Sequence, residues 1–151
     1  MGIEQDIRQT KFVNSRQKAM LNILYTYGWV IERIKNLLAS EDITHQQYNI
    51  LRILRGSNPQ PISTLQIRER MLDKMSDTSR IVDRLVAKGL AKKVISTTDK
   101  RLVDVTITEK GQKLLKRLDD QTDHTSEIMA NLDEKESEQL SNLLDKLRSS
   151  N

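Results

Sequence analysis

The sequence predicts a mostly α-helical fold that carries one small β-hairpin. Apolar residues recur at helical spacing along much of the chain of 151 residues, which favours helices. One stretch alternates instead, so that Val103, Val105 and Ile107 fall on one face of a strand. Residues 96–101, just before this strand, contain no glycine or proline and make a loop too long for a tight two-residue turn. We therefore expect a projecting hairpin in an otherwise helical protein.

The composition excludes several kinds of site. The chain has no cysteine, so disulfides and thiolate metal sites are absent. His45 and His124 fall on different predicted helices without a ligand spacing, and no phosphate-binding glycine loop or nucleophile motif is present. We expect neither an enzyme nor a bound metal or cofactor. Because no apolar run approaches the ~20 residues of a membrane span, we also expect a cytoplasmic protein without a membrane partner.

The charge is strongly segregated along the sequence. Residues 1–51 contain 6 basic and 5 acidic side chains, residues 52–117 contain 16 and 7, and residues 118–151 contain 3 and 9, so the net charges are +1, +9 and −6. A basic excess confined to the middle segment predicts contact with a polyanion there. The alternative is an ordinary solvated surface.

A long first helix is predicted over residues 14–39. Tyr25 and Trp29 fall near the side opposite its main apolar seam. A helix that is apolar on two sides needs two surfaces to pack against, such as its own core and a second subunit. We therefore expect a homodimer. The main seam consists of Met20, Leu24, Tyr27, Ile31, Ile34 and Leu38.

Two shorter helices with capping signals follow. Thr44 is expected to cap the first, with Gln47 as the reciprocal cap, and Ser63 the second, with Gln66 in the same role. The segment GSNPQP separates the two helices, and the segment LDKM is expected to form the turn after the second. The apolar contacts are expected from Ile50, Leu51 and Leu54 in the first helix and Leu65 and Ile67 in the second.

The segment SDTSRIVDRLVAKG predicts the next helix. Ser76 is a plausible cap, Asp77 suits the positive end of the helix dipole, and Gly89 is expected to end the helix in a left-handed conformation. Ile81 and Leu85 are expected to face the core. Helix, short helix, turn, helix and hairpin is the order of a winged helix-turn-helix, in which one helix enters the DNA major groove.

Basic and hydroxyl side chains gather at the predicted DNA-facing positions. Small hydroxyls permit close approach to DNA, and arginine can contact guanine or a phosphate. In the wing, Lys100 and Arg101 are expected at the tip, where Arg101 could enter the minor groove. Asp99 is expected to hold the shape of the loop. The helix positions on the front and outer side are Ser76, Ser79, Arg80 and Arg84.

The C-terminal segment predicts two more helices. One is expected over residues 109–131 with Thr108 as its cap, and Asp133 with Glu136 forms a capping pair for the last. One side of the last helix carries Leu140, Leu143, Leu144 and Leu147.

The segments SDTSRIVDRLVAKGLAKK and STTDKRLVDVTITEKGQKLL together resemble the MarR family of bacterial transcription regulators. The motifs are DRL with a downstream Lys-Gly, the wing pair Asp99 and Arg101, and Thr108 with Gly111 at the entry to the next helix. The resemblance implies three segments along the chain. Residues 1–40 would form a dimerisation helix, residues 41–110 the winged DNA-binding domain, and residues 111–151 further dimerisation helices. By motif position it implies DNA contacts from Ser76, Thr78, Ser79, Arg80, Arg84 and Arg101.

The same resemblance implies a homodimer on a pseudo-palindromic operator, more often a repressor than an activator, and a small-molecule effector. The alternative is a helical protein–protein adaptor that keeps the winged fold without binding DNA. The effector's identity, the operator and the regulated genes do not follow from the sequence. Packing or dimer contacts are the preferred role for four aromatic residues that are also weak candidates for an effector pocket: Tyr25, Tyr27, Trp29 and Tyr48.

Overall fold

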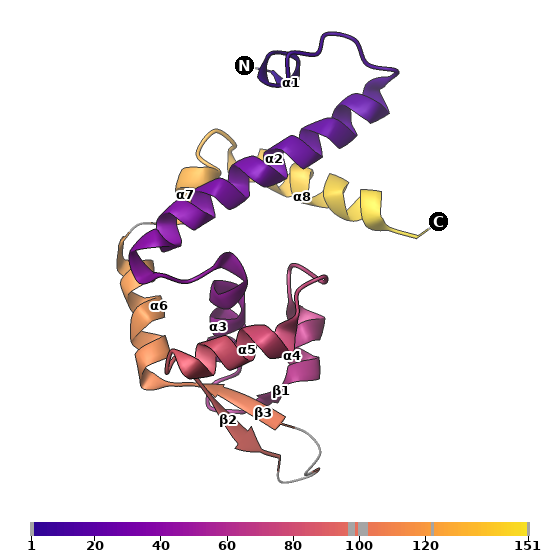
Figure 1. Ribbon diagram of the computed structural model, residues 1–151. Coiled ribbons are helices and arrows are strands. Elements are labelled where there is room, and N and C mark those ends of the chain that lie inside the picture. Colours follow the sequence, from indigo (N-terminus) through magenta and orange to yellow (C-terminus); the bar gives the residue numbers. More distant parts are fainter. Residues whose placement is uncertain (1, 97–98, 100–102, 122, 151) are drawn as a thin grey trace.

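A computed structural model of the protein describes residues 2–96, 99, 103–121 and 123–150 (Figure 1). It is mostly helical, as the sequence predicts, and it contains a small three-stranded antiparallel sheet. The sheet lies at one end of the molecule, and α2, α7 and α8 lie at the other. The elements are α1 (Ile3–Asp6), α2 (Ser15–Leu38), the 3-10 helix η1 (Ala39–Glu41), α3 (His45–Ser57), β1 (Ile62–Ser63), α4 (Thr64–Arg70), α5 (Thr78–Ala87), β2 (Ala91–Ile95), β3 (Val103–Ile107), α6 (Glu109–Gln121), α7 (His124–Ile128) and α8 (Glu134–Arg148).

Helix ends follow the capping signals in most places. The side chains of Thr44 and Ser63 each accept the predicted hydrogen bond from the backbone of a glutamine three residues on, and both glutamines reciprocate. Asp133 and Glu136 form the same arrangement at α8. These caps satisfy backbone donors that have no partner within their own helix. All three predicted capping pairs are confirmed.

The sheet contains one strand that the sequence prediction missed. β2 and β3 form the expected hairpin, with Val105 opposite Lys93. The short β1 joins the other edge of β3, with Ile62 opposite Val105, so the order is β1-β3-β2. β1 therefore ties the start of α4 to the base of the hairpin. Val105 and Ile107 are buried as predicted, but Val103 is 40% exposed because it lies at the outer end of its strand.

The hydrophobic core lies among α3, α4, α5, the sheet and α6. The prediction holds for α3 and for Ile67 of α4, but it is wrong for Leu65, which is 60% exposed. In α5, Val82 rather than Ile81 is fully buried, and Ile81 only packs against the edge of the core. The buried cluster comprises Leu38, Ile43, Ile50, Leu51, Leu54, Ile62, Ile67, Met71, Val82, Leu85, Leu90, Ala91, Val105, Ile107, Leu114, Leu115 and Leu118.

The predicted helix over residues 109–131 is divided in the structure. α6 ends at Gln121, and α7 begins at His124 with Asp123 as its cap. The Asp123 carboxylate accepts one hydrogen bond from the Ser126 hydroxyl and another from the Ser126 backbone N–H at 3.2 Å, and these two bonds lower the pKa of Asp123. Asp123 is therefore a cap inside the predicted helix, and it marks the start of a new helix. The lack of apolar residues in this segment was not sufficient to predict that boundary.

Helices α2 and α8 leave many apolar side chains exposed. The C-terminal end of α2 joins the core through Leu38, whereas apolar side chains in the middle of this helix are exposed to solvent. None of the helices in the described ranges is long and apolar enough to cross a membrane. The exposed apolar side chains on these two helices are Met20, Ile23, Leu24, Tyr25, Tyr27, Leu140, Leu143 and Leu147.

Candidate nucleic-acid interface

Helix α5 is built as an outward-facing helix on a buried support. Its cap is Asp77, whose carboxylate accepts a hydrogen bond from the backbone N–H of Arg80 at 3.2 Å. The expectation that Ser76 caps this helix is therefore wrong by one residue. Val82 and Leu85 anchor the inner side with no exposed surface. Gly89 ends the helix with φ +73°, the left-handed conformation expected there.

The outer side of α5 presents two arginines. Arg80 and Arg84 are four residues apart and both exposed, so they lie along one side of the helix. Neither guanidinium has a hydrogen bond or ion pair among the residues that the structure describes. Ser79 is exposed beside them. Because no acid neutralises these two cations, they are available to an anionic partner.

Two of the predicted DNA contacts point inward instead. Thr78 is only 5% exposed, and its hydroxyl oxygen has no hydrogen-bond partner among the described residues. The hydroxyl of Ser76 is also buried without a partner, although the residue as a whole is half-exposed. Thr78 lies on the same side of α5 as Val82 and Leu85, which explains its burial. In this arrangement, neither hydroxyl presents itself to DNA.

Helix α4 and the following turn hold α5 in place. Ile67 and Met71 are buried against the core. The backbone N–H of Leu72 donates a hydrogen bond to the Asn49 side chain of α3 at 3.0 Å. The ammonium of Lys74 donates to carbonyls in the last turn of α4, where positive charge is favourable. The turn between α4 and α5 is therefore tied both to α3 and to α4, although Leu72 itself is 89% exposed.

The base of the wing is tied to α5 by an ion pair. Asp83 of α5 pairs with Lys93 of β2, so the acid that the sequence places beside Arg84 is paired with the wing. At the start of the loop, the Asp99 N–H donates a hydrogen bond to the Ser96 hydroxyl at 3.3 Å. The predicted wing contacts Lys100 and Arg101 lie outside the described residues.

Close packing fixes the angle between α6 and the hairpin. The Thr108 hydroxyl donates to the carbonyl of Gly89 at 2.7 Å and accepts from the backbone N–H of Gly111 at 3.1 Å. Thr108 thus caps α6 as predicted and also links it to the end of α5. A Cβ atom at Gly111 would lie 2.4 Å from the carbonyl oxygen of Leu90 and 2.8 Å from Cγ1 of Ile107. Only glycine fits at this contact.

Two cavities flank α5. One, of about 690 Å³, lies between α5 and the segment that joins α2 to α3. The other, of about 360 Å³, lies between α4 and the N-terminus of α5. The smaller cavity brings Arg68 of α4, which we did not predict, beside the start of α5. The only sequence signal for a role of Arg68 is that it lies in the segment 52–117, which has an excess of basic residues. The smaller cavity is lined by Thr64, Leu65, Arg68, Ser76, Asp77, Thr78 and Ser79.

The joint between α2 and α3 is held by charged contacts. Arg117 of α6 donates two hydrogen bonds of 2.8 Å to the Glu41 carboxylate, which lowers the pKa of Glu41. Arg55 of α3 pairs with Asp119 of α6 at 2.6 Å. His45, at the start of α3, has a lowered pKa, chiefly because it is partly buried and also because Lys35 is near. The contact of Glu41 with Arg117 ties η1, which directly follows α2, to α6, and the pair of Arg55 with Asp119 ties α3 to α6.

The four aromatic candidates for an effector pocket do not meet at either cavity. Tyr25 and Tyr27 are exposed on α2. Arg33 stacks on the Trp29 ring at 3.4 Å, and Tyr48 packs against the core. In the described ranges, no cluster of three or more histidine, aspartate or glutamate side chains could hold a metal ion.

Comparison with known proteins identifies the winged segment. Residues 43–103 match the sequence model of the MarR family. No protein with curated annotation matches significantly. Among solved structures, a MarR mutant from E. coli in complex with operator DNA is 23% identical with a TM-score of 0.81, covering 93% of this chain and 100% of its own.

Two further structures show the same fold. A MarR transcription factor from Planctomyces limnophilus is 29% identical with a TM-score of 0.66 and covers 89% of this chain and 98% of its own. Bordetella bronchiseptica BpsR, whose DNA binding is regulated by 6-hydroxynicotinic acid, is 20% identical with a TM-score of 0.77 and covers 94% of this chain and 100% of its own. Residues 43–103 of this chain thus match the MarR family, and nearly the whole chain shares the winged-helix fold of these solved regulators.

Proposed function

We propose that this protein is a sequence-specific DNA-binding regulator of transcription. It acts as a homodimeric repressor on a pseudo-palindromic operator. The observation that carries the proposal is the position of two arginines, Arg80 and Arg84, on the outer side of a helix whose inner side is buried in the core. Neither guanidinium has an ion-pair partner within the part of the chain that the structure describes. A repressor in this form occupies its operator and excludes other proteins from it.

The DNA contacts that we propose differ slightly from the sequence prediction. From α5 we retain Ser79, Arg80 and Arg84, and from the wing Lys100 and Arg101. We leave out direct contacts from the buried hydroxyls of Ser76 and Thr78. We add Arg68 of α4 as a phosphate contact, because it is exposed beside the N-terminus of α5, where anions bind favourably.

The homodimer is supported by the exposed apolar side chains of α2 and α8. These helices fall in the proposed dimerisation segments, residues 1–40 and 111–151, on either side of the DNA-binding segment 41–110. Leu114, Leu115 and Leu118 belong to the core of the winged lobe, so α6 also supports the DNA-binding segment. A symmetric dimer places two copies of α5 on successive turns of DNA, about 34–36 Å apart.

The test selects bound sequences from random duplex DNA and then measures their affinity by fluorescence anisotropy at several salt concentrations. A regulator that neutralises about six phosphates should show a slope of log K against log salt near −5. Sedimentation of the protein with and without DNA should give a dimer at micromolar concentration. A salt-independent interaction, or no DNA binding in dilute buffer, would instead favour the adaptor function.

A response to a small molecule is supported by the regulated homologue BpsR.

A further inference from the structure

The joint between α2 and α3 contains a residue in an uncommon backbone conformation. Asp42 has φ +51° and ψ +45°, which is the left-handed region that residues with a side chain rarely adopt. Asp42 lies between η1 and α3, so its backbone angles set the direction in which α2 leaves the winged lobe. Such a conformation persists only where the surrounding contacts hold it. The contacts made by Asp42 therefore matter for the placement of α2.

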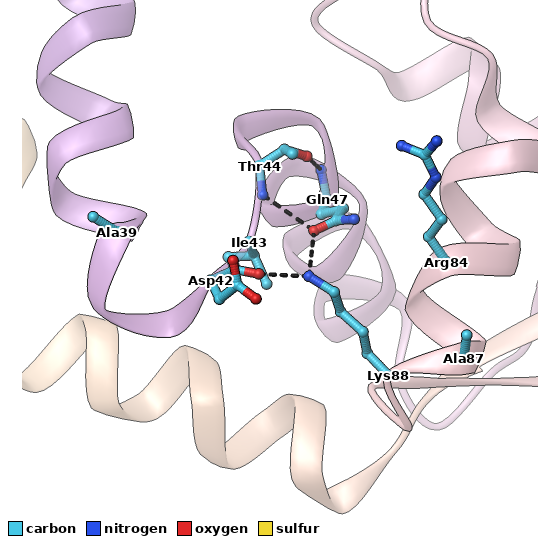
Figure 2. A pocket seen from close by; sticks show the side chains of 8 residues that line it. All are labelled: Ala39, Asp42, Ile43, Thr44, Gln47, Arg84, Ala87 and Lys88. Atoms are coloured by element: carbon cyan, nitrogen blue, oxygen red, sulfur yellow. Dashed lines mark hydrogen bonds between the residues drawn. The ribbon is translucent and has the colours of Figure 1, made fainter.

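Lys88 reaches this joint from the end of α5, where it is the C-cap. Its ammonium donates one hydrogen bond to the backbone carbonyl of Asp42 and another, of 3.4 Å, to the side-chain oxygen of Gln47 (Figure 2). That oxygen also accepts from the backbone N–H of Thr44 at 3.1 Å, and Gln47 is only 4% exposed. One ammonium thus connects the end of α5 both to the left-handed residue and to the first turn of α3.

The backbone of Lys88 is itself held in place. Its N–H donates to the carbonyl of Arg84 at 3.0 Å, and the N–H of Leu90 donates to the carbonyl of Leu85 at 2.9 Å. From the other side, the ammonium of Lys110 in α6 donates to the carbonyl of Lys88 at 2.9 Å. The lysine that reaches across to the joint therefore starts from a fixed position at the end of α5.

The other contacts at the joint differ in kind from that of Lys88. Leu38 anchors the last turn of α2 in the core, and a buried anchor at one end of a helix still allows the helix to pivot. The pair of Glu41 with Arg117 links two side chains, each of which can rotate. Lys88 instead bonds to the main chain of Asp42, so its contact acts directly on the backbone angles of the joint.

We propose that Lys88 is a positioning residue that sets the angle between α2 and α5 and thereby determines which half-site spacing the protein accepts. The effect on spacing rests on the proposed function, in which α2 belongs to the dimerisation segment and α5 contacts DNA. In a symmetric dimer, a change in this angle moves both copies of α5. One base pair more or less between half-sites shifts them by about 3.4 Å and rotates them by about 34–36°. A dimer with a fixed angle therefore discriminates between spacings, and a dimer with a loose joint does not.

The first experiment measures the joint without DNA and without relying on the dimer. Spin labels are attached at Glu32→Cys on α2 and Lys92→Cys on β2, two exposed positions in a chain that has no cysteine of its own. The doubly labelled chain is mixed with a large excess of unlabelled chain, so each measured distance lies within one chain. By double electron–electron resonance, the chain with Lys88 should give one narrow distance distribution. Lys88→Met should broaden this distribution or add a second peak, and an unchanged distribution would overturn the proposal.

A second variant and two controls separate the contact from other effects. Lys88→Gln has an uncharged side chain that is one atom shorter, and it should broaden the distribution in the same way. Because Lys88 is partly exposed at a helix end, both variants should fold with the wild-type circular dichroism spectrum. Lys116→Met removes an exposed lysine of α6 and should leave the distribution narrow.

Asp42→Asn is the control for the carboxylate. It removes the negative charge but keeps the backbone carbonyl, and asparagine tolerates the left-handed conformation. The distance distribution should therefore stay narrow. A distribution as broad as that of Lys88→Met would mean that the carboxylate, and not the carbonyl, holds the joint, which would overturn the contact that we assign.

The second experiment varies the spacing in the selected operator. The wild type should bind that operator at least about tenfold more tightly than operators with one base pair added or removed between the half-sites. In Lys88→Met this preference should fall to about threefold or less, whereas Lys116→Met should keep it. An unchanged preference in Lys88→Met would overturn the role in spacing. A protein that binds no DNA, or binds it as a monomer, would overturn the proposed function, while the distance distributions would still decide whether Lys88 holds the joint.

Discussion

Gly111→Ala is the sharpest test of the packing that sets the wing on the body. The new methyl group would lie 2.4 Å from the Leu90 carbonyl oxygen and 2.8 Å from Cγ1 of Ile107. The first neighbour is backbone, which cannot rotate away, so the helix or the strand must move. Such overpacking costs about 1–3 kcal/mol, and the better helix propensity of alanine returns at most about 1 kcal/mol. We expect a net loss of about 1–2 kcal/mol.

The assay is urea unfolding followed by circular dichroism at 222 nm, with thermal unfolding as a second measurement. A loss of 1–2 kcal/mol corresponds to a decrease in Tm of about 2–8 °C for a chain of this length. Gly56→Ala is the matched control, because Gly56 is also helical but a Cβ there meets nothing within 4 Å. That variant should be as stable as the wild type or more stable, by up to about 1 kcal/mol. Gly111→Ala with wild-type stability would refute the close contact.

Three further predictions concern DNA binding, capping and pH. Arg80→Ala and Arg101→Ala should each weaken operator binding by about 1–3 kcal/mol in gel-shift titration while the dimer stays intact; unchanged affinity would remove the residue from the interface. Asp77→Ala should destabilise the protein by about 1 kcal/mol in urea unfolding through loss of the α5 cap, and no loss would argue against that cap. The contact with Arg117 lowers the pKa of Glu41, so its stabilisation is complete above the unfolded-state pKa and disappears as the pH falls through the folded-state pKa. Between pH 6 and pH 3, the wild type should therefore lose more stability than Glu41→Gln, and equal losses would contradict this role for the pair.

The features that sequence analysis predicted best depend on neighbours in the chain. The reciprocal pairing of Thr44 with Gln47 needs only three residues of spacing, and the left-handed Gly89 needs only its own lack of a side chain. The alternation that ends at Ile107 identifies a strand from one segment alone. The order of these local elements was sufficient to predict a winged helix-turn-helix, and the family comparison confirms it.

The errors arise where two local signals compete. Ser76 and Asp77 are adjacent, and both residue types are good helix caps. Asp77 is the cap because the helix is oriented so that Val82 and Leu85 are buried. That register also turns Thr78 inward, away from the face on which motif position had placed it. After Thr108 the sequence prediction extended one helix to residue 131. The spacing of the residues did not show that Asp123 starts a new helix.

The contacts of Lys88 could not have been found from the sequence. Lys88 belongs to the end of α5, whereas Asp42 and Gln47 come from segments about forty residues earlier. Nothing in the spacing of Lys88 indicates that it reaches the start of α3, because that contact exists only after the chain folds back on itself. The aromatic residues that the sequence suggested for an effector lie elsewhere.

The sequence by itself determined most of the helices and caps, the hairpin and the basic middle segment, because each depends on interactions within a few residues or on a simple sum of charges. Only the tertiary structure decided that β1 pairs with β3, that Gly111 fits against Leu90, and that Lys88 reaches the joint of α2 with α3. These contacts join residues far apart in the chain. Their geometry is set by how the core packs, which no local pattern encodes.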